Sequence, residues 1–195
     1  MSAPGAELEV EVKLRLESAE EGRRLLRRAG FRVTRRRVLE DNTVFDTVEG
    51  RLRAGGELLR LRRSGGSSLL TYKGPADTKK YKSRQEVQLV LPDAETFRAI
   101  LDHLGFRPAF RYQKYRTEYA CGKNRRVVTL DETPIGVFLE LEGDPRWIDR
   151  TAALLGFGEQ SYITDSYWTL YRSHCLAQGL QVGDMASAYT PLCGH

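Results

Sequence analysis

This sequence of 195 residues lacks several features that would assign it to a specialised class of protein. No apolar run approaches the roughly 18 residues that a membrane-spanning helix needs, and the first residues contain no apolar core typical of an export signal. The three cysteines are too few and too scattered for a disulfide framework, a zinc motif or a redox motif. Nucleotide-binding glycine loops and a Ser-His-Asp pattern are also missing. We therefore expect a reduced, cytoplasmic enzyme or binding protein without membrane association.

The composition is that of a folded domain. Hydrophobic residues make up 41% of the chain and charged residues 29%, which excludes a disordered chain. This length suffices to bury a core without disulfides or a structural metal. The net charge of +5 is the difference between 31 basic and 26 acidic residues. That excess alone is compatible with nucleic acid, a membrane surface or a small polyanion as partner.

Residues 7–16 alternate strictly between charged and apolar side chains. A period of two predicts a strand with one charged and one apolar face. Further candidate strands are joined mostly by short connections rich in Gly, Asp, Asn or Pro, which favours antiparallel hairpins. These candidates are residues 32–40, 42–47, 57–63, 68–73, 82–91, 107–120, 125–132 and 136–143.

Three helices are predicted between the strands, each with a recognisable start and stop. Ser18 with Glu21 forms a capping-box pattern, and aspartates open the other two helices. Each helix ends at a glycine followed by phenylalanine, which gives the ranges 18–30, 93–105 and 144–156. We expect one α+β domain over residues 1–175, followed by a weakly patterned tail over 176–195.

Basic and acidic residues recur at every second position in strand after strand. Arg60 and Arg62 alternate with leucines, and so do Glu140 and Glu142. A sheet that closed with these faces inward would form a polar tunnel. Its arginines and lysines suit phosphate oxygens, whereas its carboxylates would repel a phosphate unless a hard divalent cation lay between them. The pattern therefore predicts a site for a metal-bound polyphosphate.

The motifs that carry these charges resemble a known family. Glu9, Glu11 and Lys13 form an ExExK pattern on the first strand. This pattern is similar to the signature of the CYTH superfamily, the triphosphate tunnel metalloenzymes, which includes class IV adenylyl cyclases, thiamine triphosphatases and inorganic triphosphatases. The resemblance covers roughly residues 7–172 and continues in LRLR (59–62), TYKGP (71–75), SRQE (83–86), KYR (114–116), LDE (130–132), FLELEG (138–143) and Ser166-Tyr167.

The resemblance implies a closed antiparallel β-barrel of about eight strands with helices packed outside. It also implies that carboxylates hold one or two Mg²⁺ or Mn²⁺ ions, with Glu9, Glu11, Asp131, Glu140 and Glu142 as candidate ligands. The expected substrate-binding residues are Lys13, Arg60, Arg62, Lys73, Arg84, Lys114, Arg116 and Arg125. Those expected to take part in catalysis are Glu9, Glu11, Lys13 and Lys73.

Two activities are compatible with these residues. A triphosphatase directs water at the terminal phosphorus, and a cyclase directs the ribose 3′-hydroxyl at the α-phosphorus, with the same charge stabilisation. Class IV cyclases carry a His-Phe pair upstream of ExExK where this sequence has Ala3 and Pro4, and Asp165 stands where some relatives have a basic residue. We therefore favour a triphosphatase for nucleotide, thiamine or inorganic triphosphate, acting as a monomer or homodimer.

A non-catalytic module for polyphosphate or RNA is the remaining alternative. Its support is the arginine-rich stretch over residues 23–37. Leu25, Leu26 and Ala29 form a buried helix stripe within that stretch, so its arginines are expected on a solvated face. A pure anion binder also gains nothing from the four glutamates of the strands. Nucleic acid is therefore the less favoured partner.

Overall fold

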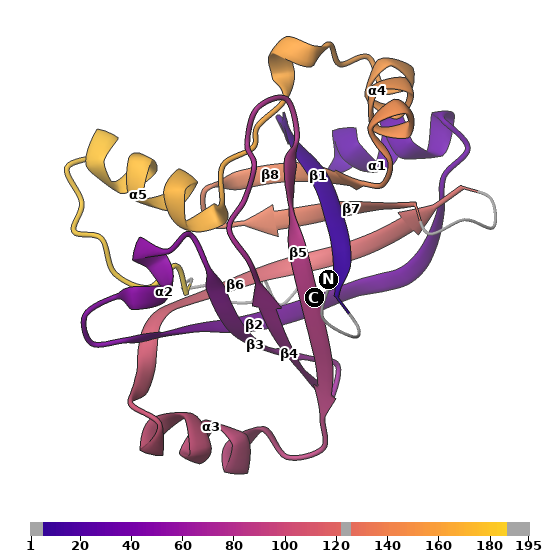
Figure 1. Cartoon of the computed structure of the whole chain (residues 1–195). Helices are drawn as coiled ribbons and strands as arrows, with labels where there is room; N and C mark the ends of the chain where they lie inside the picture. The colour runs from indigo at the N-terminus through magenta and orange to yellow at the C-terminus, as the bar shows by residue number, and fades with distance from the viewer. Residues whose placement is uncertain (1–5, 122–125, 187–195) are drawn as a thin grey trace, which may run out of the picture.

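The computed structural model describes residues 6–121 and 126–186. Its strands form one closed antiparallel barrel in the order β1-β5-β4-β3-β2-β6-β7-β8, which confirms the predicted fold (Figure 1). The strands are β1 (Glu7–Leu16), β2 (Arg32–Thr47), β3 (Leu58–Ser64), β4 (Ser67–Lys73), β5 (Lys82–Leu91), β6 (Phe106–Ala120), β7 (Val127–Thr133) and β8 (Gly136–Glu142).

The helices lie outside the barrel, as predicted. They are α1 (Ala19–Arg28), α2 (Arg51–Ala54), α3 (Ala94–His103), α4 (Pro145–Leu154) and α5 (Tyr167–Ala177), with a 3₁₀ turn at Glu159–Ser161. The predicted N-caps of α1, α3 and α4 are confirmed, because Ser18, Asp93 and Asp144 each accept a backbone N–H of the first helical turn. The described helices are all too short or too polar to cross a bilayer.

Two details differ from the sequence-based expectation. Residues 32–40 and 42–47 form one strand, β2, with register shifts near Val33, Arg35 and Val44 instead of a break at residue 41. Asp41 is a continuing strand residue because β6 pairs with β2 on both sides of it. Helices α2 and α5 were not expected, since four residues leave no periodicity and α5 has only a weakly amphipathic pattern.

The main apolar core lies between the barrel wall and two helices. The outward-facing residues of β1, β7 and β8 pack against α1 and α4, so the apolar half of each alternating strand is covered. Fully buried members of this core include Val12, Leu14, Leu130, Leu139 and Ile148. Because the core lies outside the barrel, the charged half of each strand is left to line the interior.

A second apolar cluster lies beneath α5. Tyr167 from the first turn of α5 packs with Phe110 and Tyr112 of β6 and with Phe138 of β8. Met185, which is 2% exposed, joins this cluster, and its backbone bonds to Arg111 O and Gln113 N of β6. The expected tail boundary at residue 175 thus falls within α5, and part of the expected tail packs against the barrel.

Candidate functional site

The barrel interior holds a cavity of about 320 Å³. Its lining combines nine basic side chains with six glutamates, drawn from seven of the strands. The basic residues are Lys13, Arg35, Arg60, Arg62, Lys73, Lys82, Arg84, Lys114 and Arg116. The glutamates are Glu9, Glu11, Glu86, Glu118, Glu140 and Glu142. A hollow of about 350 Å³ beside α3 lies outside the barrel, and there Arg111 and Asp41 are already paired with each other.

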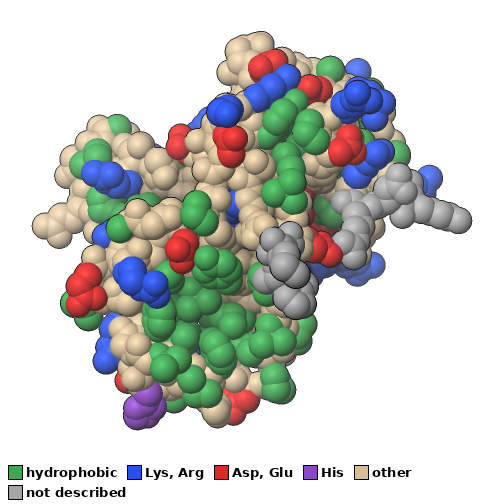
Figure 2. All heavy atoms as spheres, in the orientation of Figure 1, with side chains coloured by type: hydrophobic (Ala, Val, Ile, Leu, Met, Phe, Trp, Pro, Cys, Tyr) green, Lys and Arg blue, Asp and Glu red, His purple; other side chains and the backbone are tan. Residues whose placement is uncertain are grey.

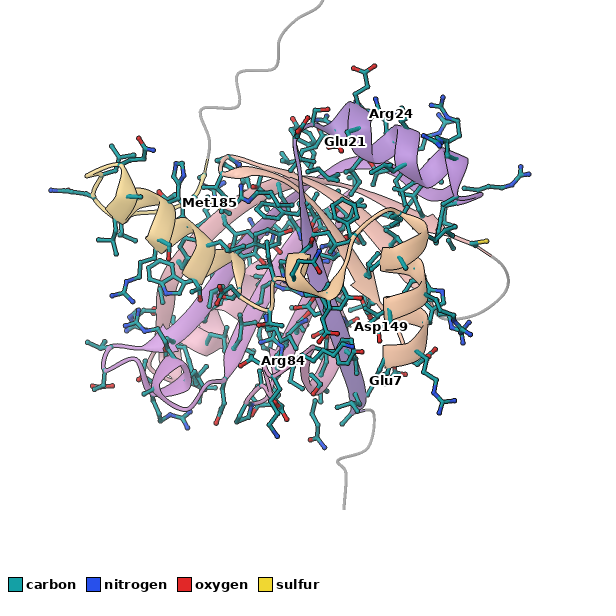
Figure 3. All side chains as sticks on the ribbon, turned by 90° about the horizontal axis from the view of Figure 1, so that it is seen from above. Glu7, Glu21, Arg24, Arg84, Asp149 and Met185 are labelled. Carbon is teal, nitrogen blue, oxygen red and sulfur yellow. The ribbon has the colours of Figure 1, made fainter. Side chains whose placement is uncertain are left out.

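Glutamates gather at the end of the cavity where β1 begins and β8 ends. The register places Glu11 of β1 directly across from Glu142 of β8, and Glu9 two residues earlier on the same face of β1. Arg84 of β5 lies opposite Glu9 and marks this end of the barrel in Figure 3. Like charges at directly opposed positions destabilise a sheet, so this arrangement requires cations nearby.

Lysines supply part of the compensating charge. Lys73 Nζ lies 2.6 Å from both carboxylate oxygens of Glu9 and 2.9 Å from Glu86. Glu11 Oε1 lies 3.2 Å from Lys13 Nζ and 3.2 Å from Lys82 Nζ. These charge-assisted hydrogen bonds hold the long side chains in place inside the cavity.

The acidities of these glutamates differ according to their neighbours. Burial opposes ionisation of Glu11, but the lysines around it outweigh burial and keep its pKa well below the usual value. Burial raises the pKa of Glu9 despite Lys73. The surrounding protein and the charge of Glu9 raise the pKa of Glu142 to about 7, although Glu142 is exposed at the cavity mouth. Glu9 and Glu142 are therefore the carboxylates at this end whose charged forms the surrounding protein disfavours.

The donor set at this end fits a hard divalent cation. Within residues 6–121 and 126–186, no three Asp, Glu, His or Cys side chains already converge as a ligand group, because the glutamates turn toward lysines. Burial and the neighbouring glutamates raise the pKa values of Glu9 and Glu142, so a cation bound beside them would favour their charged forms. Carboxylate oxygens are the ligands that Mg²⁺ and Mn²⁺ prefer. Glu9, Glu11 and Glu142 are the side chains placed to supply them.

Arg60 and Arg62 of β3 line the cavity wall opposite these glutamates. Arg60 donates to Tyr112 Oη at 3.3 Å and to Thr71 Oγ1 at 3.4 Å. Arg62 lies 3.0 Å from Glu40 and donates to Asn42 at 3.0 Å. These partners fix both guanidinium groups at the cavity wall, where their remaining N–H groups can donate to phosphate oxygens.

Asp131 lies behind this wall. It is fully buried and accepts hydrogen bonds from Arg116 at 2.7 and 2.6 Å, from Lys114 at 2.6 Å and from Tyr167 Oη at 2.8 Å. Arg116 also contacts Glu140. Asp131 is not among the cavity-lining residues, so the structure places this predicted ligand one layer behind the others.

Apart from Asp131 and Arg125, the predicted site residues all line the one cavity. Arg125, Ala3 and Pro4 lie outside the described residues. Lys82 and Glu86 were not predicted as site residues, although they share the alternating face of β5 with Arg84. Buried Glu40 was also missed, since the predicted break at residue 41 hid its alternation along β2.

Comparisons with known proteins agree with this architecture. A family model described as the CYTH domain matches residues 7–167. A candidate adenylate cyclase of Methanocaldococcus jannaschii is 32% identical over 136 residues, covering 69% of this chain and 76% of that protein.

Solved structures share the fold. A Pyrococcus horikoshii protein has a TM-score of 0.73 and 26% identity, over 85% of this chain and 99% of its own. A Hippeastrum protein, described as a candidate adenylyl cyclase with dominant triphosphatase activity, has a TM-score of 0.61 and 19% identity. That match covers 89% of this chain and 97% of the Hippeastrum chain, and at this identity it establishes the fold alone.

Proposed function

Because the chain belongs to the CYTH domain family, we propose that it is a divalent-metal-dependent triphosphatase whose substrate binds inside the barrel. The observation that carries this proposal is the pairing of two kinds of charge in one cavity. Glutamates occupy one end, and arginines with unused N–H groups occupy the wall opposite them. A bound cation would interact with the glutamates and a bound triphosphate with the arginines, so the two ligands together fit the whole cavity.

The acidic end would hold the metal. Glu9, Glu11 and Glu142 would bind it, and Lys82 and Lys73 would then be free to turn from these glutamates toward phosphate oxygens. A bound Mg²⁺ or Mn²⁺ supplies charge neutralisation on phosphate oxygens and polarisation of the phosphorus. Glu140 is held by Lys13 at 3.3 Å and by Arg116, so we assign it to orienting those cations.

The basic wall would hold the triphosphate. Arg60, Arg62 and Arg116 present planar donors suited to two-pronged contacts with phosphate oxygens, and Lys13 and Lys114 add compact charges. Asp131 fixes Lys114 and Arg116 from behind. We therefore assign Asp131 a positioning role in place of the predicted ligand role. These fixed cations stabilise the negative charge that is redistributed on the phosphoryl group during transfer.

An adenylyl cyclase is the second candidate. Its support is the name of the Methanocaldococcus jannaschii relative, a candidate adenylate cyclase. Against it stand Ala3 and Pro4 in place of the His-Phe pair of class IV cyclases. The Hippeastrum protein, described as having dominant triphosphatase activity, shows only that a protein of this fold can hydrolyse triphosphates.

Product analysis separates the two candidates. Purified protein is incubated with inorganic triphosphate, thiamine triphosphate or ATP, with Mg²⁺ or Mn²⁺, and the phosphate, pyrophosphate and cyclic AMP formed are resolved. We expect phosphate release that stops when the metal is chelated. Pyrophosphate with cyclic AMP from ATP would establish the cyclase instead. Tight triphosphate binding without turnover would indicate the non-catalytic module.

The substitution Glu9→Gln tests the metal assignment. It removes one charged metal ligand and one of the two partners of Lys73, so we expect metal-dependent turnover to fall by at least about a hundredfold, with the circular dichroism spectrum unchanged. Glu20→Gln, on the exposed surface of α1, is the matched control and should retain full activity. A Glu9→Gln variant with normal metal-dependent turnover would refute the assignment.

A further inference from the structure

The buried carboxylate of Glu40 is not explained by metal or substrate binding. Glu40 lies on β2, it is 0% exposed, and it is not among the residues that line the cavity. Within residues 6–121 and 126–186, no group donates a well-aligned hydrogen bond to either of its carboxylate oxygens. Such a buried carboxylate is costly unless opposite charge lies close to it. The neighbours of Glu40 therefore decide what it does.

Four cations surround this carboxylate. Arg62 Nη1 lies 3.0 Å from Glu40 Oε1. Lys114 Nζ and Arg116 Nε each lie 3.9 Å from the other oxygen, Oε2. Burial opposes ionisation of Glu40, but these three cations and Arg60 outweigh burial and lower its pKa to about 2. Glu40 is therefore ionised at neutral pH. We name its four neighbours the cation cluster: Arg60, Arg62, Lys114 and Arg116.

The two arginines of β3 depend most on Glu40. Among the described residues, Glu40 is the one carboxylate within 4.0 Å of Arg62, and Arg60 has none that close. The other two members of the cation cluster also contact Asp131. Burial and the charges of Arg60 and Arg116 lower the pKa of Arg62, whereas Glu40 acts in the opposite direction. The guanidinium groups therefore repel one another, and Glu40 offsets that repulsion.

Solvent cannot offset this repulsion as it does on the surface. Figure 2 shows basic and acidic side chains interspersed on the outside of the molecule, where water and salt screen their charges. Inside the barrel, Arg60 is 8% exposed and the side chain of Lys114 is 2% exposed. The buried carboxylate therefore supplies the compensation that water supplies outside.

Two contacts from β2 hold Arg62 in place. Glu40 and Asn42 lie two residues apart on the same face of β2, and Asn42 is directly opposite Arg62 in the register. Glu40 contacts Nη1 of the guanidinium group, and Asn42 Oδ1 accepts a hydrogen bond from Nε at 3.0 Å. Arg62 still lines the cavity, so its remaining N–H groups are the ones available to a phosphate oxygen.

We propose that Glu40 is a positioning residue for the triphosphate site, because its charge allows the cation cluster to assemble before any anion is bound. A triphosphate that enters the cavity then supplies further negative charge to the same cations. This role rests on the proposed function only in requiring that the cavity binds a triphosphate. The charge of Glu40 also opposes anion binding, so it limits the affinity of the site while it stabilises the empty protein.

Glu40→Gln tests this role because it keeps the size of the side chain and removes its charge. Without anions, the melting temperature should fall, since the cations lose a counter-ion. Isothermal titration calorimetry with inorganic triphosphate and EDTA should show binding about tenfold tighter than in the wild type. Triphosphate should also raise the melting temperature of the variant by more than that of the wild type. Binding no tighter than in the wild type, or lost stability that triphosphate does not recover, would overturn the proposal.

Glu132→Gln is the matched control. Glu132 contacts Arg37 at 2.8 Å and is not among the cavity-lining residues, so this variant also removes the counter-ion of an arginine, but outside the cavity. Its affinity for triphosphate should equal that of the wild type. A gain in affinity as large as that of Glu40→Gln would reveal a general effect of net charge and refute a specific role for Glu40.

Moving the charge along β2 provides a second test, which does not require Glu40→Gln to fold by itself. Asn42→Asp adds a carboxylate beside Arg62 and should weaken triphosphate binding by about tenfold. Combined with Glu40→Gln, it restores the net charge next to Arg62, so the double variant should bind triphosphate with the affinity of the wild type. A folded double variant that keeps the altered affinity of either single variant would contradict the proposal.

The same titrations separate this role from the proposed function. A wild-type chain that binds no triphosphate would refute the site itself, and with it both proposals. Normal triphosphate binding by the wild type, together with unchanged affinity in Glu40→Gln, would refute the role of Glu40 alone. Neither result depends on which products the enzyme releases.

Discussion

Two properties of Glu142 cannot be read from the number of charged residues in the sequence. It lies across from Glu11 at the cavity mouth, and its environment raises its pKa to about 7 from an ordinary value of 4.5. The folded protein therefore binds more protons at Glu142 than the unfolded chain does between these two values. Glu142 therefore destabilises the folded state increasingly as the pH rises from 4.5 to about 7.

This yields a pH prediction for the metal-free protein. The melting temperature should fall between about pH 5 and about pH 8, and it should fall less in Glu142→Gln, which carries no charge. Added Mg²⁺ or Mn²⁺ should recover stability at the upper end, because protons and metal compete for the same carboxylate. Differential scanning fluorimetry measures both effects. Glu118→Gln, another cavity glutamate, is the control, and an equal flattening in that variant would contradict the assignment to Glu142.

Asp131 illustrates how a buried acid organises the site. Its oxygens hold Lys114, Arg116 and Tyr167. Asp131→Asn leaves these cations without a matched charge, so we expect the free energy of unfolding to fall by about 3 kcal/mol. The KM for triphosphate should rise by about tenfold, equivalent to about 1.4 kcal/mol of binding. Urea unfolding and steady-state kinetics measure the two effects.

Asp149 on α4 provides the comparison for Asp131. It also accepts from tyrosines and a lysine, at 2.8, 3.0 and 3.1 Å, but it lies near the surface and away from the cavity (Figure 3). Because exposed ion pairs contribute little, Asp149→Asn should cost about 1 kcal/mol or less and leave KM unchanged. If both variants lost the same free energy of unfolding, Asp131 would contribute no more than an ordinary exposed polar residue.

At the level of single elements, alternation in the strands was the most informative signal. It predicted β1, β3, β4, β5, β6 and β8 nearly to the residue, because a half-buried strand must separate its two faces with period two. It was weaker for β2, where register shifts displace the alternation and a supposed break divided the strand. Helix starts were predictable because capping depends on local side chains.

Gly22 in α1 shows what helix periodicity alone misses. A Cβ at this position would lie 2.7 Å from both Leu130 Cδ1 and Leu16 Cδ1, so the helix approaches the barrel closely here. Gly22→Leu should therefore cost about 1–3 kcal/mol through overpacking, although leucine is the better helix former. Arg23→Leu, one position along on the exposed face, should change stability by less than about 0.5 kcal/mol. Urea unfolding decides, and a stabilised Gly22→Leu variant would contradict the close packing.

At the level of the whole molecule, the chain after α5 returns to the barrel. Met185 pairs with β6 and packs among Tyr112 and Tyr167, the residues that contact Arg60 and Asp131. Met185→Ala should lower the free energy of unfolding by about 2–4 kcal/mol and raise the KM for triphosphate. Leu180→Ala, at a position 56% exposed in the same segment, should have little effect. Equal stability of the two variants would show that the segment adds nothing to the fold.

The sequence by itself determined the barrel and most of its lining. Charged residues at every second position identify which face of each strand avoids the core, and this requires no knowledge of the partner strands. The resemblance to the CYTH family added the roles expected for Glu9, Lys13 and Arg60. The net positive charge of the chain indicates less about its function than the positions of the basic and acidic residues relative to each other.

Only the tertiary structure decided the distribution of charge within the tunnel. Which glutamate is neutralised depends on strand register, and register placed Glu142 opposite Glu11 while Asp131 came to lie behind Arg116. Lys82 and Glu40 joined the site for the same reason, since their partners are distant in sequence. Such contacts between distant residues carry no local signal in the chain.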